Sequence, residues 1–329
     1  NATVENLKQY LEKMNQYEHV MTLLNWDMET TMPKLGFEGH ARALTYFSTE
    51  LFKLSKTEEL GKMLEELSSP KEYEKLNDMW KFVVKRMKRD YDESRRIPQD
   101  FFEQFVQAKS ESGNAWKEAK RASDFSIYAP HLEKVIEMTK KMAEYTNPGE
   151  EVYNVLLNQY EEGMDSDTID RLFDDLKREL APFVKKVLAA KQPDDSRFKG
   201  KYEIEEQKKV QKMLLDYIGF DWEAGTVGET EHPFTLNFSS KDVRVTNHYY
   251  EKDALSAMYS AIHQGGHAIF EQHVNPDFDG TVAGSCRYCG IHESQSRFYE
   301  NILGRNKNFW IPIYKNLGTL LPKFKEISL

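Results

Sequence analysis

Apolar side chains recur at intervals of three and four residues along most of the first 220 residues. This spacing places them on one face of a helix. The clearest repeats are Leu7, Leu11, Met14, Tyr17, Met21 and Leu24, then Leu44, Phe47, Leu51 and Leu54, then Tyr73, Leu76, Met79, Val83 and Met87. The pattern predicts helices throughout residues 1–220, divided into segments where prolines interrupt it.

The pattern changes between Gly219 and Tyr250, where apolar and polar residues alternate and β-branched and aromatic residues are frequent. Alternation with a period of two is typical of a half-buried strand. We therefore expect a small β region at about residues 231–248, with two or three short strands that form a hairpin. Helical spacing resumes at about residues 252–273 and again at 291–304.

The overall composition narrows the possible classes of protein. Acidic residues exceed basic ones, 54 to 45, and the formal net charge is −9. Proteins that depend on phosphate contacts are usually basic, so this balance disfavours nucleic acid as a partner. No apolar run approaches the length of a membrane span. The two cysteines, Cys286 and Cys289, are too few for a disulfide framework, which favours a cytoplasmic protein with reduced thiols.

Two short motifs have both a functional and a structural interpretation. Cys286 and Cys289 have the spacing of a zinc-ligand pair, but no second pair completes a four-ligand site, so packing in a loop is favoured. Residues 80–89 mix basic and aromatic side chains as some nucleic-acid patches do. Because Trp80, Val83 and Met87 keep helical spacing, we expect this segment to bury one face of a helix.

The strongest chemical signal is a cluster of histidines. Six of the nine in the chain lie between residues 232 and 292. His263 and His267 are four residues apart in a segment expected to be helical, so both imidazoles lie on one face. Such a pair also arises by chance, so two incidental histidines remain an open alternative.

Three neighbouring features favour a metal site over that alternative. Gly265 and Gly266 separate the histidines, and because each glycine costs a helix about 1 kcal/mol, they indicate that a backbone or a substrate comes close. Glu293, in the next predicted helix, would complete a three-ligand zinc site with one position open. The strand region before the helix adds three side chains suited to orienting ligands or contacting substrate: His232, Asp242 and Arg244.

Gln264 occupies the position that a glutamate takes in the His-Glu-x-x-His motif of zinc peptidases. That glutamate moves a proton from the attacking water to the leaving amine. A carboxamide does not titrate near neutral pH, although it has nearly the same shape and forms hydrogen bonds. Two explanations stay open: a deliberate Glu-to-Gln change that blocks turnover, and a natural protein that binds metal and peptide without cutting.

Four ordered motifs resemble those of the Taq-type (thermostable) carboxypeptidases, a family of zinc metallopeptidases. They are His232-Pro-Phe, Asp242-Val-Arg-Val-Thr, His263-Gln-Gly-Gly-His and His292-Glu-Ser-Gln. Two earlier segments, 24–33 and 153–164, are similar to the family as well, so the resemblance covers the whole chain. The combination of motifs and their order is very specific.

The resemblance implies a fold and an activity. The fold would be mainly α, an elongated helical metallopeptidase with a deep groove and a small β-sheet beside the active site. The activity would be removal of single C-terminal amino acids from peptides by a metal-activated water, with broad specificity except against proline. The cofactor would be Zn²⁺, with Co²⁺ possible, and members are commonly intracellular homodimers. Residues 1–329 would form a single catalytic domain.

The resemblance also implies a role for each motif residue. His263, His267 and Glu293 would bind the metal, and Gln264 would stand at the position of the general base. Substrate contacts would come from four side chains of the strand region: His232, Asp242, Arg244 and Thr246. Of these, either His232 or Arg244 would position the substrate or polarise its scissile carbonyl.

Two departures from the family pattern bear on function. Gln264 removes the base, so the chain as written would be nearly inactive. Two later family motifs, one with an arginine and one of the form Gln-Asp-x-His-Trp, are absent, so the chain is expected to be truncated at its C-terminus, with the last third missing. Three hypotheses result: an inactivated metallocarboxypeptidase, a natural non-catalytic scaffold or sensor that binds metal and peptide, and a helical interaction protein whose histidines are incidental.

Overall fold

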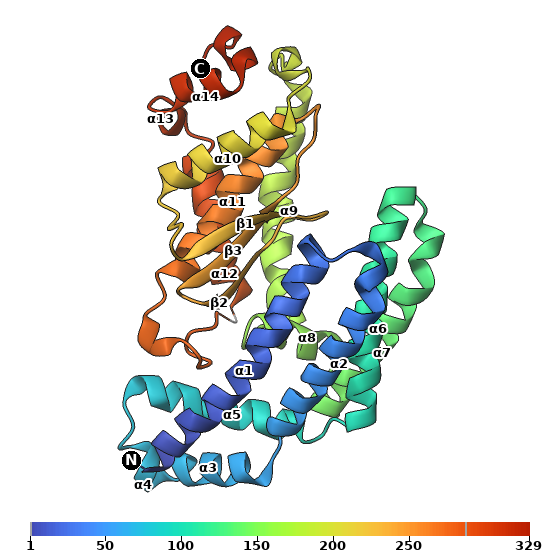
Figure 1. Ribbon diagram of the computed structural model, residues 1–329, viewed down its shortest axis with the longest axis vertical. Coiled ribbons are helices and arrows are strands. Elements are labelled where there is room, and N and C mark those ends of the chain that lie inside the picture. Colours follow the sequence, from blue (N-terminus) through green and yellow to red (C-terminus); the bar gives the residue numbers. More distant parts are fainter. Residues whose placement is uncertain (1, 287) are drawn as a thin grey trace. The chain divides into compact units, whose positions relative to one another are not determined.

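The structure, a computed structural model, describes residues 2–286 and 288–329. Helices make up most of the described chain and three short strands form one sheet, which confirms the prediction of a mainly α fold (Figure 1). The chain forms two compact units. Unit 1 comprises Asn1–Leu156 and Asn275–Ser285, and unit 2 comprises Leu157–Val274 and Cys286–Leu329. A single catalytic domain would have to combine both units, and it stays a prediction.

Unit 1 is built from helices that pack pairwise. They are α1 (Ala2–Thr30), α2 (Phe37–Leu54), α3 (Glu58–Ser68), α4 (Pro70–Tyr73), α5 (Asp78–Ser94), α6 (Gln99–Ala122) and α7 (Ala129–Thr146). Helix α1 packs against α2 and α3, α2 against α6, α3 against α5, and α6 against α7. The next helix, α8 (Val152–Tyr160), contains the boundary to unit 2.

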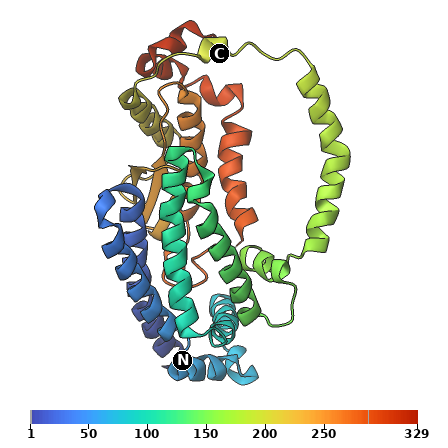
Figure 2. The same cartoon turned by 90° about the vertical axis from the view of Figure 1, so that its right-hand side faces the viewer.

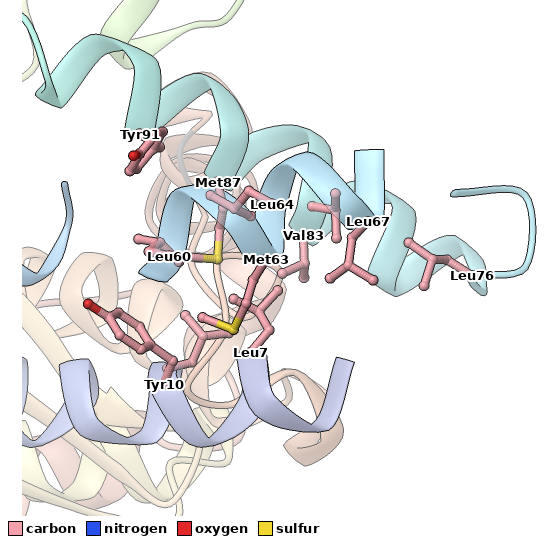
Figure 3. Close-up of a cluster of buried hydrophobic side chains, with 12 residues drawn as sticks. Leu7, Tyr10, Leu60, Met63, Leu64, Leu67, Leu76, Val83, Met87 and Tyr91 are labelled. Carbon is pink, nitrogen blue, oxygen red and sulfur yellow. The ribbon is translucent and has the colours of Figure 1, made fainter. Parts of the chain in front are cut away.

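The amphipathic faces predicted from the sequence meet in the core of unit 1. Leu7 of α1, Leu64 of α3, and Val83 and Met87 of α5 are buried against one another (Figure 3). Full burial of each such side chain stabilises the fold by about 1.5–3 kcal/mol. Helix α5 therefore buries the apolar face expected for residues 80–89, which confirms the packing interpretation of that segment.

Unit 2 is organised around one central helix. Its helices are α9 (Ser166–Ala189), α10 (Ile204–Ile218), α11 (Ala254–Gln272), α12 (Cys289–Arg297), α13 (Lys307–Trp310) and α14 (Tyr314–Leu320), with a π-helical segment, η5 (Phe298–Leu303), directly after α12. Its strands are β1 (Gly225–Glu229), β2 (Thr235–Ser239) and β3 (Asp242–Asn247). Helix α11 packs against α10, α12, η5, β2 and β3, so the sheet lies beside the helix that carries both candidate histidines.

The sheet has the strand order β1-β3-β2. Strands β2 and β3 are antiparallel neighbours, as the predicted hairpin requires, whereas β1 pairs with β3 in parallel. The predicted β region of about 231–248 therefore begins too late, because β1 starts at Gly225. Two of the five residues of β1 are glycines, which are infrequent in strands, so its sequence gives little strand signal. Its place is set by pairing with β3, where Val227 lies opposite Val245.

Helix α9 differs from the other long helices because none of its side chains is buried. Several of its apolar residues are each at least 45% exposed, among them Leu172, Leu176, Leu180 and Phe183. Figure 2 shows α9 apart from the other helices of unit 2, with an extended linker between it and α10. Despite these apolar residues, no helix within residues 2–286 and 288–329 combines the length and apolarity that a membrane crossing needs.

Candidate metal centre

Helix α11 holds both candidate histidines on one face. The helix begins after Asp253, whose carboxylate accepts a hydrogen bond from the backbone N–H of Ser256 at 3.1 Å and so caps the first turn. It continues to Gln272, as the sequence predicted. The imidazole centroids of His263 and His267 are 5.0 Å apart, so the spacing of four residues produces the expected neighbouring pair.

Glu293 of α12 completes a group of three possible ligands. Its Oε2 lies 3.2 Å from Nε2 of His267 and 3.8 Å from Nε2 of His263. The ligand atoms of the three residues all lie within 4.8 Å of one another. Zinc bonds of about 2.0–2.2 Å in a tetrahedral site place ligand atoms about 3.3–3.6 Å apart, so these distances fit one ion. Within the described residues, no other histidine, cysteine or acidic residue forms such a group.

The two glycines between the histidines explain how close the neighbouring helices come. A Cβ atom at Gly266 would lie 2.9 Å from Cα of Ser296 and 3.0 Å from the backbone oxygen of Gln295, both on α12. A Cβ atom at Gly265 would lie 2.5 Å from Cδ1 of Ile218 on α10. The close approach inferred from the sequence is confirmed, and at Gly266 the approaching group is the backbone next to Glu293.

A carboxylate orients His263 from the side opposite to Glu293. Oε2 of Glu300 lies 2.9 Å from Nδ1 of His263, and Oε1 of Glu300 accepts a hydrogen bond from the Arg305 guanidinium at 3.2 Å. Glu300 lies in η5, and its side chain is largely buried. A carboxylate that accepts the Nδ1 proton leaves the lone pair on Nε2, the nitrogen that faces Glu293. Sequence spacing did not identify Glu300, because its position depends on the π-helical turn.

The protonation of the site suits a metal ion. Burial, together with the neighbouring His292 and His263, lowers the pKa of His267 to about 4. Burial raises the pKa of Glu293, but the adjacent His263 and His267 and hydrogen bonds with Ser296 and Arg297 together outweigh it, so that the pKa of this carboxyl lies below its ordinary value. At neutral pH, His267 is therefore neutral and Glu293 is ionised, and these are the forms that bind metals.

Gln264 is buried and both ends of its amide have partners. Its Oε1 accepts a hydrogen bond from the Thr235 hydroxyl at 2.8 Å, and its Nε2 donates to the backbone oxygen of Pro233 at 3.3 Å. These bonds fasten the side chain to β2 and to the residues before it. The chemical role expected of a glutamate here, which is to accept and return a proton, is not available to this amide.

The predicted substrate contacts lie in different environments. His232 is exposed. Asp242 and Arg244 form a two-pronged ion pair on β3, with N···O distances of 2.9 and 2.8 Å. Thr246 is fully buried, and its hydroxyl accepts hydrogen bonds from the Thr230 hydroxyl and the Phe234 backbone. This burial argues against a direct substrate contact by Thr246, while substrate contacts by the other three stay predictions.

Two histidines and a glutamate on neighbouring helices, each oriented by its own hydrogen bonds, form a candidate site for one metal ion in a mainly helical fold, an arrangement that suits a helical metallopeptidase. Residues 6–329 match the family model described as carboxypeptidase Taq (M32) metallopeptidase. The chain therefore belongs to this family.

Individual relatives agree with this assignment. Carboxypeptidase 1 of Bacillus subtilis (strain 168) is 37% identical over 324 residues, which are 97% of this chain and 64% of that protein. Thermostable carboxypeptidase 1 of Pyrococcus furiosus is 35% identical over 326 residues, which are 97% of this chain and 64% of that protein. The crystal structure of a protein called BsuCP has a TM-score of 0.96 and 35% identity, and an M32 carboxypeptidase from Deinococcus radiodurans R1 has 0.88 and 28%. Both structural matches extend over 100% of this chain and over 66% of the matched protein's chain. The chain thus spans somewhat less than two-thirds of its relatives' length.

Proposed function

We propose that this chain carries the metal centre of a metallocarboxypeptidase, an enzyme that removes single C-terminal amino acids from peptides. The observation that carries the proposal is the convergence of His263, His267 and Glu293, whose ligand atoms lie within 4.8 Å of one another. Membership of the family supports peptides as the class of substrate, because the relatives are named carboxypeptidases.

The donor set fits zinc. Two imidazole nitrogens and one carboxylate oxygen suit Zn²⁺ and leave a fourth coordination position open, and Co²⁺ accepts the same donors. His263, His267 and Glu293 would hold the ion. When bound there, it would supply Lewis-acid chemistry, which polarises a carbonyl and makes a water more acidic. The chain's own contribution is orientation: Glu300 fixes the ring of His263, and Arg297 donates to the second oxygen of Glu293 at 2.8 Å.

Gln264 limits what this chain does with a bound peptide. The buried amide is well placed to orient a neighbouring group by hydrogen bonding, but it does not carry a proton from water to the leaving amine. We therefore infer that the chain as written is inactive or nearly so. His232 and Arg244 remain the candidates for holding the peptide, and an intracellular location and a homodimer remain predictions from the resemblance.

The hydrogen bonds of Gln264 also favour the alternative, a natural member that binds metal and peptide without cutting. Its Nε2 faces the backbone oxygen of Pro233, where a carboxylate would meet an acceptor instead of a donor. The surroundings of residue 264 are therefore satisfied by an amide. Such a protein would act as a scaffold or as a sensor of metal or peptide.

Amino-acid release from a short peptide, with zinc added, separates the two possibilities. The parent is compared with Gln264→Glu and with the double variant Gln264→Glu, His263→Ala. If only the single variant releases C-terminal residues, the enzyme proposal stands and Gln264 is the block. If neither variant releases any although zinc binds to the parent and to the single variant, the non-catalytic alternative is favoured. Equal release by the double variant would contradict the proposed metal centre.

A further inference from the structure

A chain of polar contacts leads from the sheet to His267. Nδ1 of His292 lies 2.6 Å from Nδ1 of His267, and Nε2 of His292 lies 2.6 Å from Oε1 of Glu271. The second oxygen of Glu271 accepts a hydrogen bond from Nδ2 of Asn237 at 2.9 Å. Asn237 belongs to β2, Glu271 and His267 to α11, and His292 to α12. Three elements of unit 2 are therefore joined through four side chains.

The carboxylate of Glu271 determines which group is the donor and which the acceptor in each hydrogen bond of this series. Glu271 is 5% exposed, and as a carboxylate it only accepts hydrogen bonds. His292 therefore carries its proton on Nε2 and donates it to Glu271. The other nitrogen of a neutral His292 is then an acceptor, so the contact between the two Nδ1 atoms requires that His267 be the donor. In this tautomer the lone pair of His267 lies on Nε2, the atom 3.2 Å from Glu293, which is the form that binds a metal ion.

We propose that Glu271 and His292 are positioning residues that fix the tautomer and the ring orientation of His267, and so set the affinity of the site for zinc. The two histidines of α11 are then oriented by different means. His263 contacts a carboxylate directly, that of Glu300, whereas His267 reaches one through a second imidazole. This proposal rests on the proposed metal centre, but it assigns a role to side chains that are not ligands.

Zinc affinity measured by competition with a chromophoric chelator tests the assignment. His292→Phe keeps a flat ring of similar size but removes both contacts. Loss of a hydrogen-bond partner of a metal-binding histidine typically lowers metal affinity by about 10- to 100-fold. We therefore expect His292→Phe to bind zinc more weakly by a factor of that order. The matched control is His273→Phe, since His273 is exposed at the end of α11 and its Nδ1 contacts only the backbone oxygen of Ile269 among the contacts described for its ring. This control should bind zinc within about twofold of the parent.

A spectroscopic measurement distinguishes loss of the His267 orientation from a general loss of structure in the variant. In the zinc-loaded parent, ¹⁵N NMR of the imidazoles should show His267 protonated at Nδ1, with that proton protected from exchange with water. In His292→Phe the same proton should exchange rapidly. Glu271→Gln, which keeps the shape of the side chain, should also weaken zinc binding and decides the matter if His292→Phe fails to fold.

The outcomes distinguish this proposal from the one on which it rests. If the parent binds zinc and both His292→Phe and Glu271→Gln bind it equally well, the positioning role is overturned and the metal centre stands. If the parent itself binds no zinc, the metal centre is overturned, and the positioning role with it.

Discussion

His267 should make the stability of the metal-free protein depend on pH. Its pKa is lowered to about 4 by burial and by the neighbouring His292 and His263, whereas an unfolded histidine titrates near 6.5. Between these two values the unfolded chain binds a proton that the folded chain does not. The free energy of unfolding therefore falls as the pH falls from about 6.5 to about 4, by up to about 3 kcal/mol.

Urea denaturation in the presence of a chelator measures this effect. The parent is compared at pH 7.5 and pH 4.5 with His267→Gln, which cannot titrate. The parent should lose more stability between the two pH values than the variant does, and the difference should lie within that window. An equal loss in both proteins would show that His267 takes up its proton as easily in the folded state as in the unfolded state.

The sequence indicated which candidate ligands lie close together better than it indicated the side chains that contact them. The proximity of His263 and His267 was predicted because a spacing of four in a helix determines which side chains are neighbours. The contacts of Glu271, His292 and Glu300 were not predicted, because they depend on how α11 packs against α12, η5 and β2. Contacts between elements leave no fixed spacing in the sequence.

The close packing of α11 on α12 can be tested with its two glycines. Gly266→Ala would place a Cβ atom against the backbone of Ser296 and Gln295, which can move only if α12 moves. Overpacking of this kind typically costs about 1–3 kcal/mol. Because α12 carries Glu293, we expect zinc binding by Gly266→Ala to weaken by at least about tenfold, a factor that corresponds to 1.4 kcal/mol.

Gly265→Ala is the matched control on the same helix. There the nearest atoms are the ends of the Ile218 and Leu215 side chains on α10, which can rotate away more easily than a backbone. Its melting temperature should fall slightly, if at all, and its zinc affinity should stay close to that of the parent. Titration of both variants with zinc measures the difference. If Gly265→Ala loses as much zinc affinity as Gly266→Ala, the approach of α12 is not what holds Glu293 in place.

Elements with a strong periodic pattern were predicted well, and elements defined by their neighbours were not. Helix α11 ends at Gln272, within a residue of the predicted end, because its apolar positions repeat over five turns. Strand β1 was missed because Gly225 and Gly228 dilute its pattern. The π-helical form of η5 was missed because its 6 residues are too few to show a period of their own. Residue propensities alone do not distinguish a strand such as β1 from a loop, or a π-helical turn such as η5 from an ordinary α-helix.

At the scale of the whole molecule, the candidate metal centre lies within one of the two units. The three candidate ligands, the carboxylates of Glu271 and Glu300, and the strand that carries Asn237 all belong to unit 2. Unit 1 has a separate core formed by α1, α3 and α5. Each unit therefore has its own apolar core, and bound zinc would contact only unit 2.

Zinc should accordingly protect the two units unequally. A ligand that binds only the folded state stabilises it by about 2.7 kcal/mol at a concentration 100 times its dissociation constant. Because the units have separate cores, we expect amide hydrogen exchange in α11 and β3 to slow by up to about 100-fold, while exchange at Val83 and Met87 of α5 changes little. A chelator should reverse the effect, and His263→Ala should abolish it. Equal protection in both units would mean that they unfold together, and no protection in either would contradict zinc binding at this centre.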